Sequence, residues 1–316
     1  MELRKLSGSD LNVSPIAFGG NVFGWTLDEK QSFDILDHFV DQGFNFIDTA
    51  DTYSKWAPGN KGGESETILG KWLKQRGNRD QLVIATKLGG EMGERKKGLK
   101  PSYIKQAVES SLQRLQTDYI DLYQSHYDDP ETSVEETIAA FNELIQEGKV
   151  RYIGASNLVA DRIKASNDFA RANGLKGYIT LQPLYNLYDR EKFESQYLDL
   201  VNAEKLSVLS YYALASGFLS GKYRSEADLN KSVRGGGIKK YLTERGLAIL
   251  KAMEKVANET GVSFVAIAIA WQLNKPYITA PIASATRREQ LDELLAGATL
   301  KLTKEQVELL DQASAY

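Results

Sequence analysis

The sequence predicts an α/β fold, a (β/α)8 TIM barrel with an N-terminal β-hairpin and long loops on its top face. Eight short apolar segments alternate with helical patterns along the 316 residues, and no change in composition marks a linker. Polar residues follow many of these segments, as a single site at the carboxyl ends of barrel strands requires. An open, doubly wound sheet is the alternative, but it should carry a G-x-G-x-x-G fingerprint after an early strand, where none occurs. We therefore expect residues 1–316 to form a single barrel domain.

Composition narrows the possible function classes. The chain is 42% hydrophobic, which supports a large core, and its formal net charge is −3 from 39 basic and 42 acidic residues. This balance predicts binding to neither nucleic acid nor an anionic membrane. The absence of cysteine excludes disulfides, thiolate nucleophiles and cysteine-bound metals. The N-terminus shows no apolar signal region and the longest apolar run, 264–271, is too short to span a bilayer, so we expect a cytoplasmic protein.

The first 126 residues contain the hairpin and four of the predicted strands. The turn at 7–10, between short apolar segments, predicts the hairpin. Asp28, with Gln31 three residues later, predicts a helix start, and Gly43 predicts the end of that helix. Pro101 suits the first turn of another helix. The strands predicted here are 16–20, 44–47, 82–87 and 119–126, and the helices are 28–42, 64–74 and 101–115.

The rest of the chain continues the alternation. Ser133 and Glu136 form a capping-box pattern, and Gly148 ends the apolar stripe that follows. Thr303, with Gln306 three residues later, predicts the start of the last helix. Residues 214–241 form a long irregular stretch, and loops of this length are usually functional or mobile. The predicted strands are 150–155, 178–182, 206–211 and 278–282, and the predicted helices are 134–147, 160–173, 196–203, 243–259, 263–274, 287–295 and from 303 onward.

Three ionisable residues follow predicted strands at equal spacing. Asp48, Lys87 and His126 are each 39 residues apart, about one βα unit, so they should lie side by side at the ends of the second, third and fourth strands. Isolated buried carboxylates are disfavoured, and Lys87 provides Asp48 with a cationic partner. Tyr53 follows the same strand as Asp48. Because a cation beside a phenol favours the phenolate, we expect the pKa of Tyr53 to fall below its ordinary value of about 10.

Each of these residues alone has a plainer interpretation. Asp48 could be a capping or ion-pair carboxylate, Lys87 a solvated strand end, and Tyr53, one of 16 tyrosines, a packing residue. A single histidine such as His126 is more often structural than catalytic. The joint pattern of the four residues outweighs these alternatives. The other histidine, His38, lies within a predicted helix beside acidic residues, and we expect it at the surface.

The motifs around the four residues extend the pattern. They are Asp-Thr-Ala-Asp-Thr-Tyr at 48–53, Ile-Ala-Thr-Lys at 84–87, Leu-Tyr-Gln-Ser-His at 122–126 and Gly-Lys-Val-Arg-Tyr-Ile-Gly-Ala-Ser-Asn at 148–157. Together they resemble the aldo-keto reductase family over nearly the whole chain. The segment Gly-Gly-Glu-Ser-Glu at 62–66, after a Pro-Gly loop, is most similar to the bacterial NADP(H)-dependent branch.

The resemblance implies a reaction and a role for each of the four residues. The reaction is hydride transfer between a nicotinamide and a carbonyl compound, reducing an aldehyde or ketone or oxidising the alcohol, with no metal. Tyr53 would be the general acid, Lys87 would lower its pKa and Asp48 would hold Lys87 in place. His126 would orient the carbonyl of the small-molecule substrate and could share the proton.

The resemblance also implies a site for NADPH or NADP+. Ser156, Asn157 and Gln182 match the positions that hold the carboxamide, and Tyr211 matches the aromatic residue that stacks on the nicotinamide ring. The segment 213–222 matches the loop that wraps the pyrophosphate. The expected cofactor-binding residues are Gly20, Asn21, Asp48, Ser156, Asn157, Gln182, Tyr211, Ala213, Leu214, Ser216, Gly217, Leu219, Lys222, Ser284, Thr286, Arg287, Arg288, Gln290 and Glu293.

Two parts of that site depart from familiar patterns. The segment ending in Lys222 is no phosphate-loop motif, because Tyr223 follows where Ser or Thr is required. Members of the family often carry Glu-Asn where this chain has Glu293 and Leu294, so an adenine contact by the second residue is not expected.

The start of the last barrel helix predicts which nicotinamide is used. Ser284, Thr286, Arg287 and Arg288 lie there, and a helix N-terminus provides partial positive charge and free N–H groups. Two arginines at such a position are otherwise unfavourable, so a bound phosphate would explain them. The alternative is that both are solvated helix-end residues. We expect a preference for NADPH over NADH, without deciding which arginine contacts the 2′-phosphate.

Substrate and partners are less defined. Asn21, Phe23, Trp25, Trp56 and Tyr127 are expected to line the pocket with the 214–241 loop, which favours an apolar or ring-bearing carbonyl compound. Potassium-channel β subunits share the resemblance, so a regulatory binding protein is an alternative to a metabolic enzyme. An aldolase that uses Lys87 as a Schiff base is a third, disfavoured by the neighbouring acid and phenol. The sequence indicates no oligomeric state.

Overall fold

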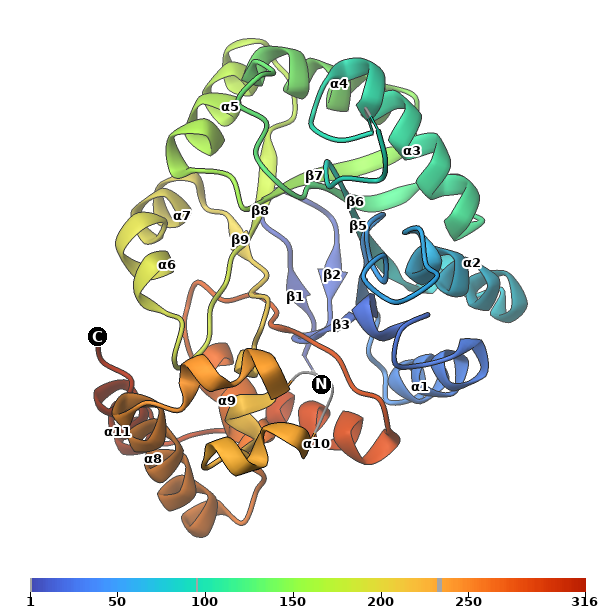
Figure 1. Ribbon diagram of the computed structural model, residues 1–316. Coiled ribbons are helices and arrows are strands. Elements are labelled where there is room, and N and C mark those ends of the chain that lie inside the picture. The colour runs from blue at the N-terminus through green and yellow to red at the C-terminus, as the bar shows by residue number, and fades with distance from the viewer. Residues whose placement is uncertain (1, 95, 232–234) are drawn as a thin grey trace.

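The computed structural model describes residues 2–94, 96–231 and 235–316, and in them eight parallel strands are surrounded by helices (Figure 1). The strands pair in the order β10-β3-β4-β5-β6-β7-β8-β9, so consecutive strands are neighbours in space. This is the order that successive right-handed βαβ units produce. The strands are β3 (Ala17–Gly19), β4 (Phe46–Asp48), β5 (Val83–Leu88), β6 (Ile120–Ser125), β7 (Val150–Ser156), β8 (Tyr178–Gln182), β9 (Ser207–Val208) and β10 (Ile282–Ala283).

The two ends of this strand order meet and close the sheet. Val208 forms a parallel bridge with Ile278, and the backbone N–H of Thr279 donates to the Val208 carbonyl oxygen at 2.9 Å. Further along, the N–H of Ile282 donates to the Ser210 carbonyl oxygen at 2.8 Å. The predicted (β/α)8 barrel is confirmed, and the doubly wound alternative is wrong.

The helices begin where the sequence signals indicate. Asp28, Ser133 and Thr303 each form a complete capping box, in which the side chain and the backbone of the cap exchange hydrogen bonds with the third helical residue. Pro101 is the first residue of its helix. The α-helices are α1 (Glu29–Asp41), α2 (Glu64–Arg76), α3 (Pro101–Leu115), α4 (Val134–Gln146), α5 (Ala160–Ala172), α6 (Glu191–Gln196), α7 (Leu198–Glu204), α8 (Glu244–Thr260), α9 (Phe264–Leu273), α10 (Arg288–Thr299) and α11 (Lys304–Ala313).

Four elements differ from the sequence-based prediction, and one of them is the strand predicted at 206–211, which is regular only at Ser207–Val208. The helix predicted at 196–203 begins as α7 only at Leu198, and a separate helix, α6, precedes it. Tyr197 divides the two because its φ of −124° lies outside the helical range. The strand predicted at 278–282 is regular only from Ile282, since Pro281 has no N–H for the ladder. The described part of 214–241 contains the short 3-10 helices η3 (Ala215–Ser220), η4 (Glu226–Lys231), η5 (Gly235–Gly237) and η6 (Lys239–Tyr241), and residues 232–234 lie outside the described residues.

The predicted hairpin fills the amino end of the barrel. β1 (Arg4–Lys5) and β2 (Asn12–Val13) pair antiparallel, and Figure 1 shows them within the ring of strands. Leu6, Leu11 and Val13 are buried in a cluster with the inward residues of the barrel, which are Ala17, Phe46, Val83, Ala85, Leu122, Leu209, Ala280 and Ile282. The hairpin thus closes this end of the barrel with apolar side chains.

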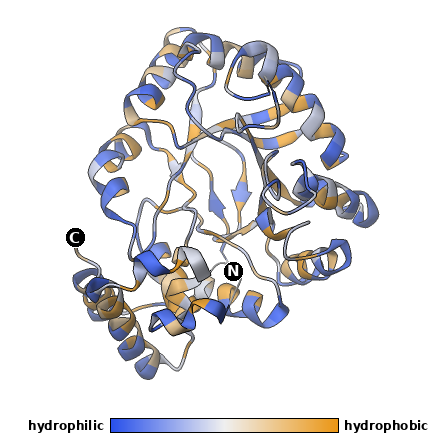
Figure 2. Ribbon diagram, in the orientation of Figure 1, coloured by the Kyte–Doolittle hydropathy of each residue, from blue (hydrophilic) through white to orange (hydrophobic). Residues whose placement is uncertain are grey.

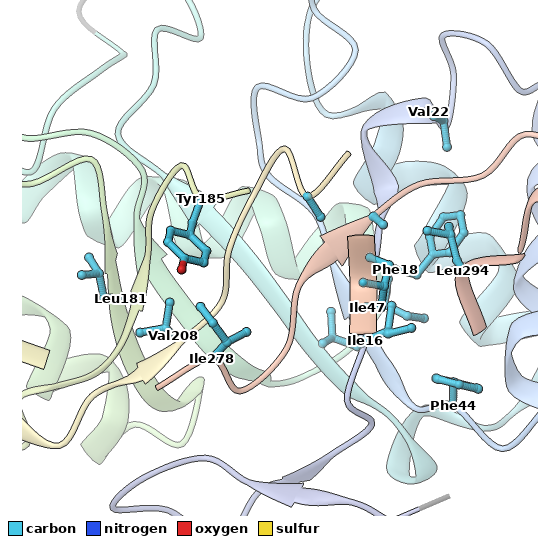
Figure 3. Packing of buried hydrophobic residues seen from close by; sticks show 14 of the residues in the cluster. Ile16, Phe18, Val22, Phe44, Ile47, Leu181, Tyr185, Val208, Ile278 and Leu294 are labelled. Carbon is cyan, nitrogen blue, oxygen red and sulfur yellow. The ribbon is translucent and has the colours of Figure 1, made fainter. Parts of the chain in front are cut away.

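A second, larger cluster joins the strands to the helices. It includes Phe18 of β3, Ile47 of β4 and Leu294 of α10, which are shown together in Figure 3. The outer helices carry hydrophilic and hydrophobic residues interleaved along their length (Figure 2), as helices with one buried face do. The rigid layer formed in this way fixes the carboxyl ends of the strands relative to one another.

One pair of helices has enough apolar length to suggest a membrane span. Within the described residues, no single helix is both long and apolar enough to cross a bilayer. α8 and α9 reach the necessary length and apolar composition only when taken together, and the chain bends by 99° between them.

Candidate active site

Three neighbouring strands end in ionisable residues at the carboxyl end of the barrel. Asp48 is the last residue of β4, Lys87 lies one residue before the end of β5, and His126 directly follows β6. Asp48 pairs in register with Ala85, and Lys87 pairs with Gln124 of β6. The structure therefore brings together the residues that are equally spaced in the sequence.

The Lys87 ammonium group is the centre of a buried cluster. Its Nζ lies 2.6 Å from Asp48 Oδ1, 2.7 Å from the backbone oxygen of Thr49 and 2.9 Å from Tyr53 Oη. The side chains of Lys87 and Asp48 are both 0% exposed. Burial lowers the pKa of Lys87, whereas the charge of Asp48 raises it. Three acceptors match the three donors of an ammonium group, so the cationic form is fully hydrogen-bonded.

Two glutamines hold the other oxygen of Asp48. Gln182 Nε2 donates to Asp48 Oδ2 at 2.9 Å, and Gln124 Nε2 donates to the same oxygen at 3.2 Å. Gln182 also lies 3.3 Å from Gln124 Oε1. Both oxygens of this buried carboxylate are therefore hydrogen-bonded, one by Lys87 and the other by the two amides.

The pKa of Tyr53 contradicts the sequence-based expectation. Burial and, after it, the negative charge of Asp48 raise this pKa well above its ordinary value. The prediction that the pKa falls is wrong, because loss of water and a nearby carboxylate oppose the phenolate more than the ammonium group favours it. Tyr53 therefore stays protonated at neutral pH, and its Oη contact with Lys87 can still stabilise a phenolate formed during a reaction.

His126 completes the cluster in its neutral form. Burial and, secondarily, the charge of Lys87 hold its pKa well below the ordinary value. Its ring lies 6.1 Å from the ring of Tyr53 and stacks on Tyr127 at 4.4 Å between centroids. Among the described residues, its buried Nδ1 has no hydrogen-bond partner. The second histidine, His38, is only partly exposed and contacts Asp292 of α10 at 2.6 Å.

The residues expected to hold the nicotinamide carboxamide follow the next strands. Ser156 Oγ donates to the Gln182 carbonyl oxygen at 2.9 Å, and Asn157 Nδ2 donates to the His126 carbonyl oxygen at 2.9 Å. Tyr211 Oη donates to Asn157 Oδ1 at 2.9 Å. These contacts place Ser156, Asn157 and Tyr211 directly beside the Lys87 cluster.

Strained backbone marks the same loops. Seven non-glycine residues described by the structure have positive φ, and two of them, Gln116 and Lys205, are helix C-caps. The other five lie in loops at the candidate site: Ser54, Asn157, Tyr212, Ala215 and Ser216. With Gly217, the last two give three consecutive residues at φ 48°, 59° and 100°. Such strain persists mainly at functional sites, and successive N–H groups in turned backbone can form an anion-binding concavity.

The neighbouring loops differ in how tightly they hold their polar residues. Ser284 Oγ lies 2.7 Å from the carbonyl oxygen of Gly19 and 2.5 Å from Asn21 Oδ1, which joins the end of β10 to η1 (Gly20–Val22). Thr286 donates to Gln290 from both its N–H and its hydroxyl, at 3.0 Å. The side chain of Lys222 is exposed, with its Nζ 5.1 Å from the centre of the Tyr223 ring.

The two arginines at the start of α10 are not equivalent. Arg288 Nε donates to Asp34 Oδ2 at 2.9 Å, and a second nitrogen of its guanidinium group contacts the other oxygen. Arg287 is the N-cap residue of the helix and is exposed, as is Glu293. An anion at this helix start would thus meet Arg287 directly, whereas Arg288 is already paired with α1.

An aromatic-walled cleft of about 370 Å³ opens beside Tyr53. Trp56 and Tyr127 form its walls, and it is also lined by Thr52, Lys55, Gly90 and Glu91. Trp56 packs edge-to-face on both Tyr53 and Trp25, at 6.1 Å and 5.5 Å. The expectation that Phe23 lines this pocket is wrong, because its ring is 0% exposed and stacks on Phe18 in the core.

Sequence reasoning missed two groups of buried polar residues. Gln124 could have been found, since it lies two residues before His126 in a strand and so faces the same side. Glu66 gave no signal, because its partners come from other elements: Thr86 Oγ1 donates to it at 2.6 Å and Arg114 Nε at 2.7 Å. Only folding brings α2, α3 and β5 together around it.

A closed parallel barrel whose carboxyl end buries a lysine between an aspartate and a tyrosine defines a class of TIM-barrel proteins with proton-transfer chemistry at the strand ends. A family model described as "Aldo/keto reductase family" matches residues 15–315 of the chain. The chain belongs to the aldo/keto reductase family, and its relatives include proteins named as reductases and oxidoreductases.

Its relatives include both enzymes and channel subunits. The chain is 35% identical over 301 residues to a probable voltage-gated potassium channel subunit beta of Arabidopsis thaliana, covering 93% of this chain and 90% of that one. It is 34% identical to an uncharacterized oxidoreductase of Bacillus subtilis, covering 98% and 95%. It is 32% identical to norsolorinic acid reductase B of Aspergillus parasiticus, covering 99% and 84%. The match to a bacterial branch in particular stays a prediction.

Proposed function

We propose that this protein is an NADPH-dependent reductase of aldehydes and ketones, and that one barrel domain carries the whole reaction. The observation that carries the proposal is the buried Lys87, whose Nζ lies 2.6 Å from Asp48 Oδ1 and 2.9 Å from Tyr53 Oη. Burying two charges is costly, because their lost hydration offsets much of their attraction. A buried ion pair that is kept next to a phenol therefore indicates a function.

The arrangement suits a proton donor. Tyr53 keeps its proton at neutral pH because burial and Asp48 raise its pKa. When the carbonyl oxygen of a substrate becomes negative, Tyr53 Oη can transfer its proton to that oxygen and Lys87 can stabilise the resulting phenolate. Asp48 fixes Lys87, and the neutral imidazole of His126 can donate a hydrogen bond to the same carbonyl oxygen. The reverse transfers would serve alcohol oxidation.

The residues around this cluster fit a dinucleotide. When bound, a reduced nicotinamide supplies a hydride to the carbonyl carbon. Ser156, Asn157 and Gln182 would hold the carboxamide, and Tyr211 would lie against the ring. The three consecutive positive-φ residues at 215–217 provide turned backbone for a pyrophosphate. Arg287, exposed at the start of α10, is the group available for a 2′-phosphate.

The cleft beside Tyr53 indicates a ring-bearing substrate. Trp56 and Tyr127 face it with large apolar surfaces, and aromatic rings prefer stacked or edge-to-face partners. The relatives named as reductases of norsolorinic acid and of versiconal hemiacetal acetate are consistent with such a carbonyl substrate. The test is a panel of aliphatic, aromatic and polycyclic carbonyl compounds, followed by NADPH absorbance. If the protein shows multiple turnover with no compound in this panel, the proposal is contradicted.

A channel-associated protein is the second candidate. The likeness to potassium channel β subunits covers 93% of the chain, so a regulatory role with the same cofactor site is compatible with the comparisons. Many turnovers per enzyme on a simple aldehyde favour the metabolic reductase, whereas a single slow turnover with retained cofactor favours the regulatory one. A Schiff-base aldolase would leave an adduct on Lys87 after borohydride reduction, and we expect none, because all three Lys87 donors are engaged.

A further inference from the structure

A second set of buried charges lies next to the Lys87 cluster. Glu66 of α2 is fully buried, and Arg114 of α3 contacts it twice, at 2.7 Å and 2.6 Å. Asp48 is paired with Lys87 in the same manner. The loop after β4 adds a third carboxyl group, Asp51, which is only 2% exposed. Among the described residues, this cluster therefore contains three buried carboxyl groups and two cations, and each cation is already paired with one carboxylate.

Asp51 is the carboxyl group left over. Among the described residues, neither of its side-chain oxygens has a hydrogen-bond partner. The backbone N–H of Thr52 lies close enough to favour the ionised form, but not in the geometry of a hydrogen bond. An unpaired buried carboxylate is strongly disfavoured, so the group should carry a proton instead. Burial and, after it, the charge of Glu66 raise the pKa of Asp51 to about 8.

The position of Asp51 links it to the reaction centre. It lies two residues before Tyr53, and its backbone N–H donates to the carbonyl oxygen of Lys87 at 3.1 Å. The buried hydroxyl of Tyr123 on β6 likewise has no partner among the described residues. The charged and titratable groups that face Asp51 are Lys87 of β5, Glu66 of α2, Arg114 and Tyr103 of α3, Tyr123 of β6 and Tyr127 of the loop after it.

We propose that Asp51 is a positioning residue that holds a proton beside the Lys87 ion pair, so that the reaction centre works with a neutral carboxyl group there and slows when that group ionises. The inference builds on the proposed reductase function. With Asp51 neutral, Asp48 is the carboxylate that balances the charge of Lys87. With Asp51 ionised, a second negative charge lies near Lys87 and opposes the phenolate that Tyr53 becomes after giving its proton to the carbonyl oxygen. Carbonyl reduction should therefore slow as pH rises through about 8.

The first test does not depend on catalysis. A carboxyl group whose pKa is higher in the folded than in the unfolded chain binds more protons when folded, so stability falls as pH rises from the unfolded value of 3.8 to about 8. Asp51→Asn removes that loss. We expect the melting temperature of this variant, relative to wild type, to increase steadily across that pH range. Asp41→Asn, an exposed aspartate at the end of α1, is the matched control and should show a constant difference.

An infrared measurement tests the proton directly. The wild-type minus Asp51→Asn difference spectrum at neutral pH should contain the C=O band of a protonated carboxyl group, and this band should disappear above about pH 9. A carboxylate band at neutral pH would overturn the proposal even if Asp51→Asn proved too unstable for kinetics, because Asp51→Ala can replace it as the reference spectrum.

The kinetic test separates positioning from a structural role. Single-turnover reduction, followed by NADPH fluorescence, should decline in wild type by on the order of tenfold between about pH 7 and about pH 9, because the neutral fraction of a carboxyl group with a pKa of about 8 falls by that factor over this range. Asp51→Asn should lack this decline, and Asp51→Glu should retain it at a shifted pH. The same decline in Asp51→Asn as in wild type would overturn the proposal. If no carbonyl compound is reduced at all, the proposed function fails, while the infrared and stability tests still judge the proton on Asp51.

Discussion

The two ends of the barrel treat buried polar groups differently. At the amino end, Leu6, Leu11 and Val13 fill the space between the strands, and the buried Asp121 is fully paired. Its carboxylate accepts from the N–H of Ile84 at 2.9 Å and contacts Arg79 and Arg151 at 2.8 Å and 2.7 Å. The fold thus supplies both oxygens of the Asp121 carboxylate with partners.

The carboxyl end buries polar groups with fewer partners. Asp51 and His126 Nδ1 have none among the described residues, and Lys87 is fully buried with its pKa lowered by burial. Leaving such groups unpaired costs stability that a purely structural end would not sacrifice. The contrast teaches that charge at the amino end supports the fold, whereas charge at the carboxyl end is kept for chemistry at the expense of stability.

The largest expected effect is a loss of turnover at the carboxyl end of the barrel without unfolding. Tyr53→Phe should lower turnover by roughly 10²-fold to 10⁴-fold and leave NADPH binding nearly intact, because only the proton donor is lost. Lys87→Met should act in the same direction, since it removes the cation that stabilises the phenolate. Turnover and cofactor Kd would be measured together. If Tyr53→Phe keeps near-wild-type turnover, or changes only the affinity for the cofactor, Tyr53 is not the proton donor.

An equally local change at the amino end should affect stability alone. Leu11→Ala should lower the free energy of unfolding by about 2–5 kcal/mol, because it leaves a cavity among the packed strand residues. Urea unfolding gives this value, and turnover of the folded variant should stay within about twofold of wild type. Val159→Ala, at a half-exposed position, is the control and should cost much less. A loss of turnover that exceeds the loss of folded protein would contradict the division between the two ends.

Asp121→Asn compares the paired carboxylates directly. It should destabilise the protein by about 2–3 kcal/mol, somewhat less than a fully buried pair would, because Arg79 and Arg151 keep some contact with water. Turnover at neutral pH should not change. Asp48→Asn, by contrast, should lower turnover as well as stability, since it removes the carboxylate that is paired with the fully buried Lys87. If Asp48→Asn and Asp121→Asn had the same effects on stability and turnover, the two carboxylates would not differ in role.

The smallest expected effect is on the preference for NADPH over NADH, which we assign to the start of α10 at the edge of the carboxyl end. NADPH should bind on the order of 10-fold to 150-fold more tightly than NADH, as one charge-assisted contact to phosphate allows. The difference should narrow with salt, and the double variant of Arg287→Ala and Arg288→Ala should lose most of it. Arg171→Ala, on the exposed face of α5, controls for a general change in charge. Fluorescence titration gives the two Kd values, and equal values for wild type at low ionic strength would defeat the claim.

The local sequence determined the frame of the molecule. The capping boxes at Asp28, Ser133 and Thr303 form as predicted because they depend only on residues three apart. The 39-residue spacing of Asp48, Lys87 and His126 placed them at neighbouring strand ends because parallel βα units repeat at that length. Patterns of this kind are local or periodic, so they can be interpreted without knowing what the chain packs against.

Only the tertiary structure decided the electrostatics and the finer contacts. The pKa of Tyr53 rises rather than falls because it depends on how much water the whole fold removes, which spacing does not report. Contacts between distant elements pair Arg288 with Asp34 and pack Phe23 in the core. They also leave Asp51 without a hydrogen-bond partner in the part of the chain that the structure describes. Sequence brought the charged groups to one place, and burial by the surrounding helices set which of them hold a proton.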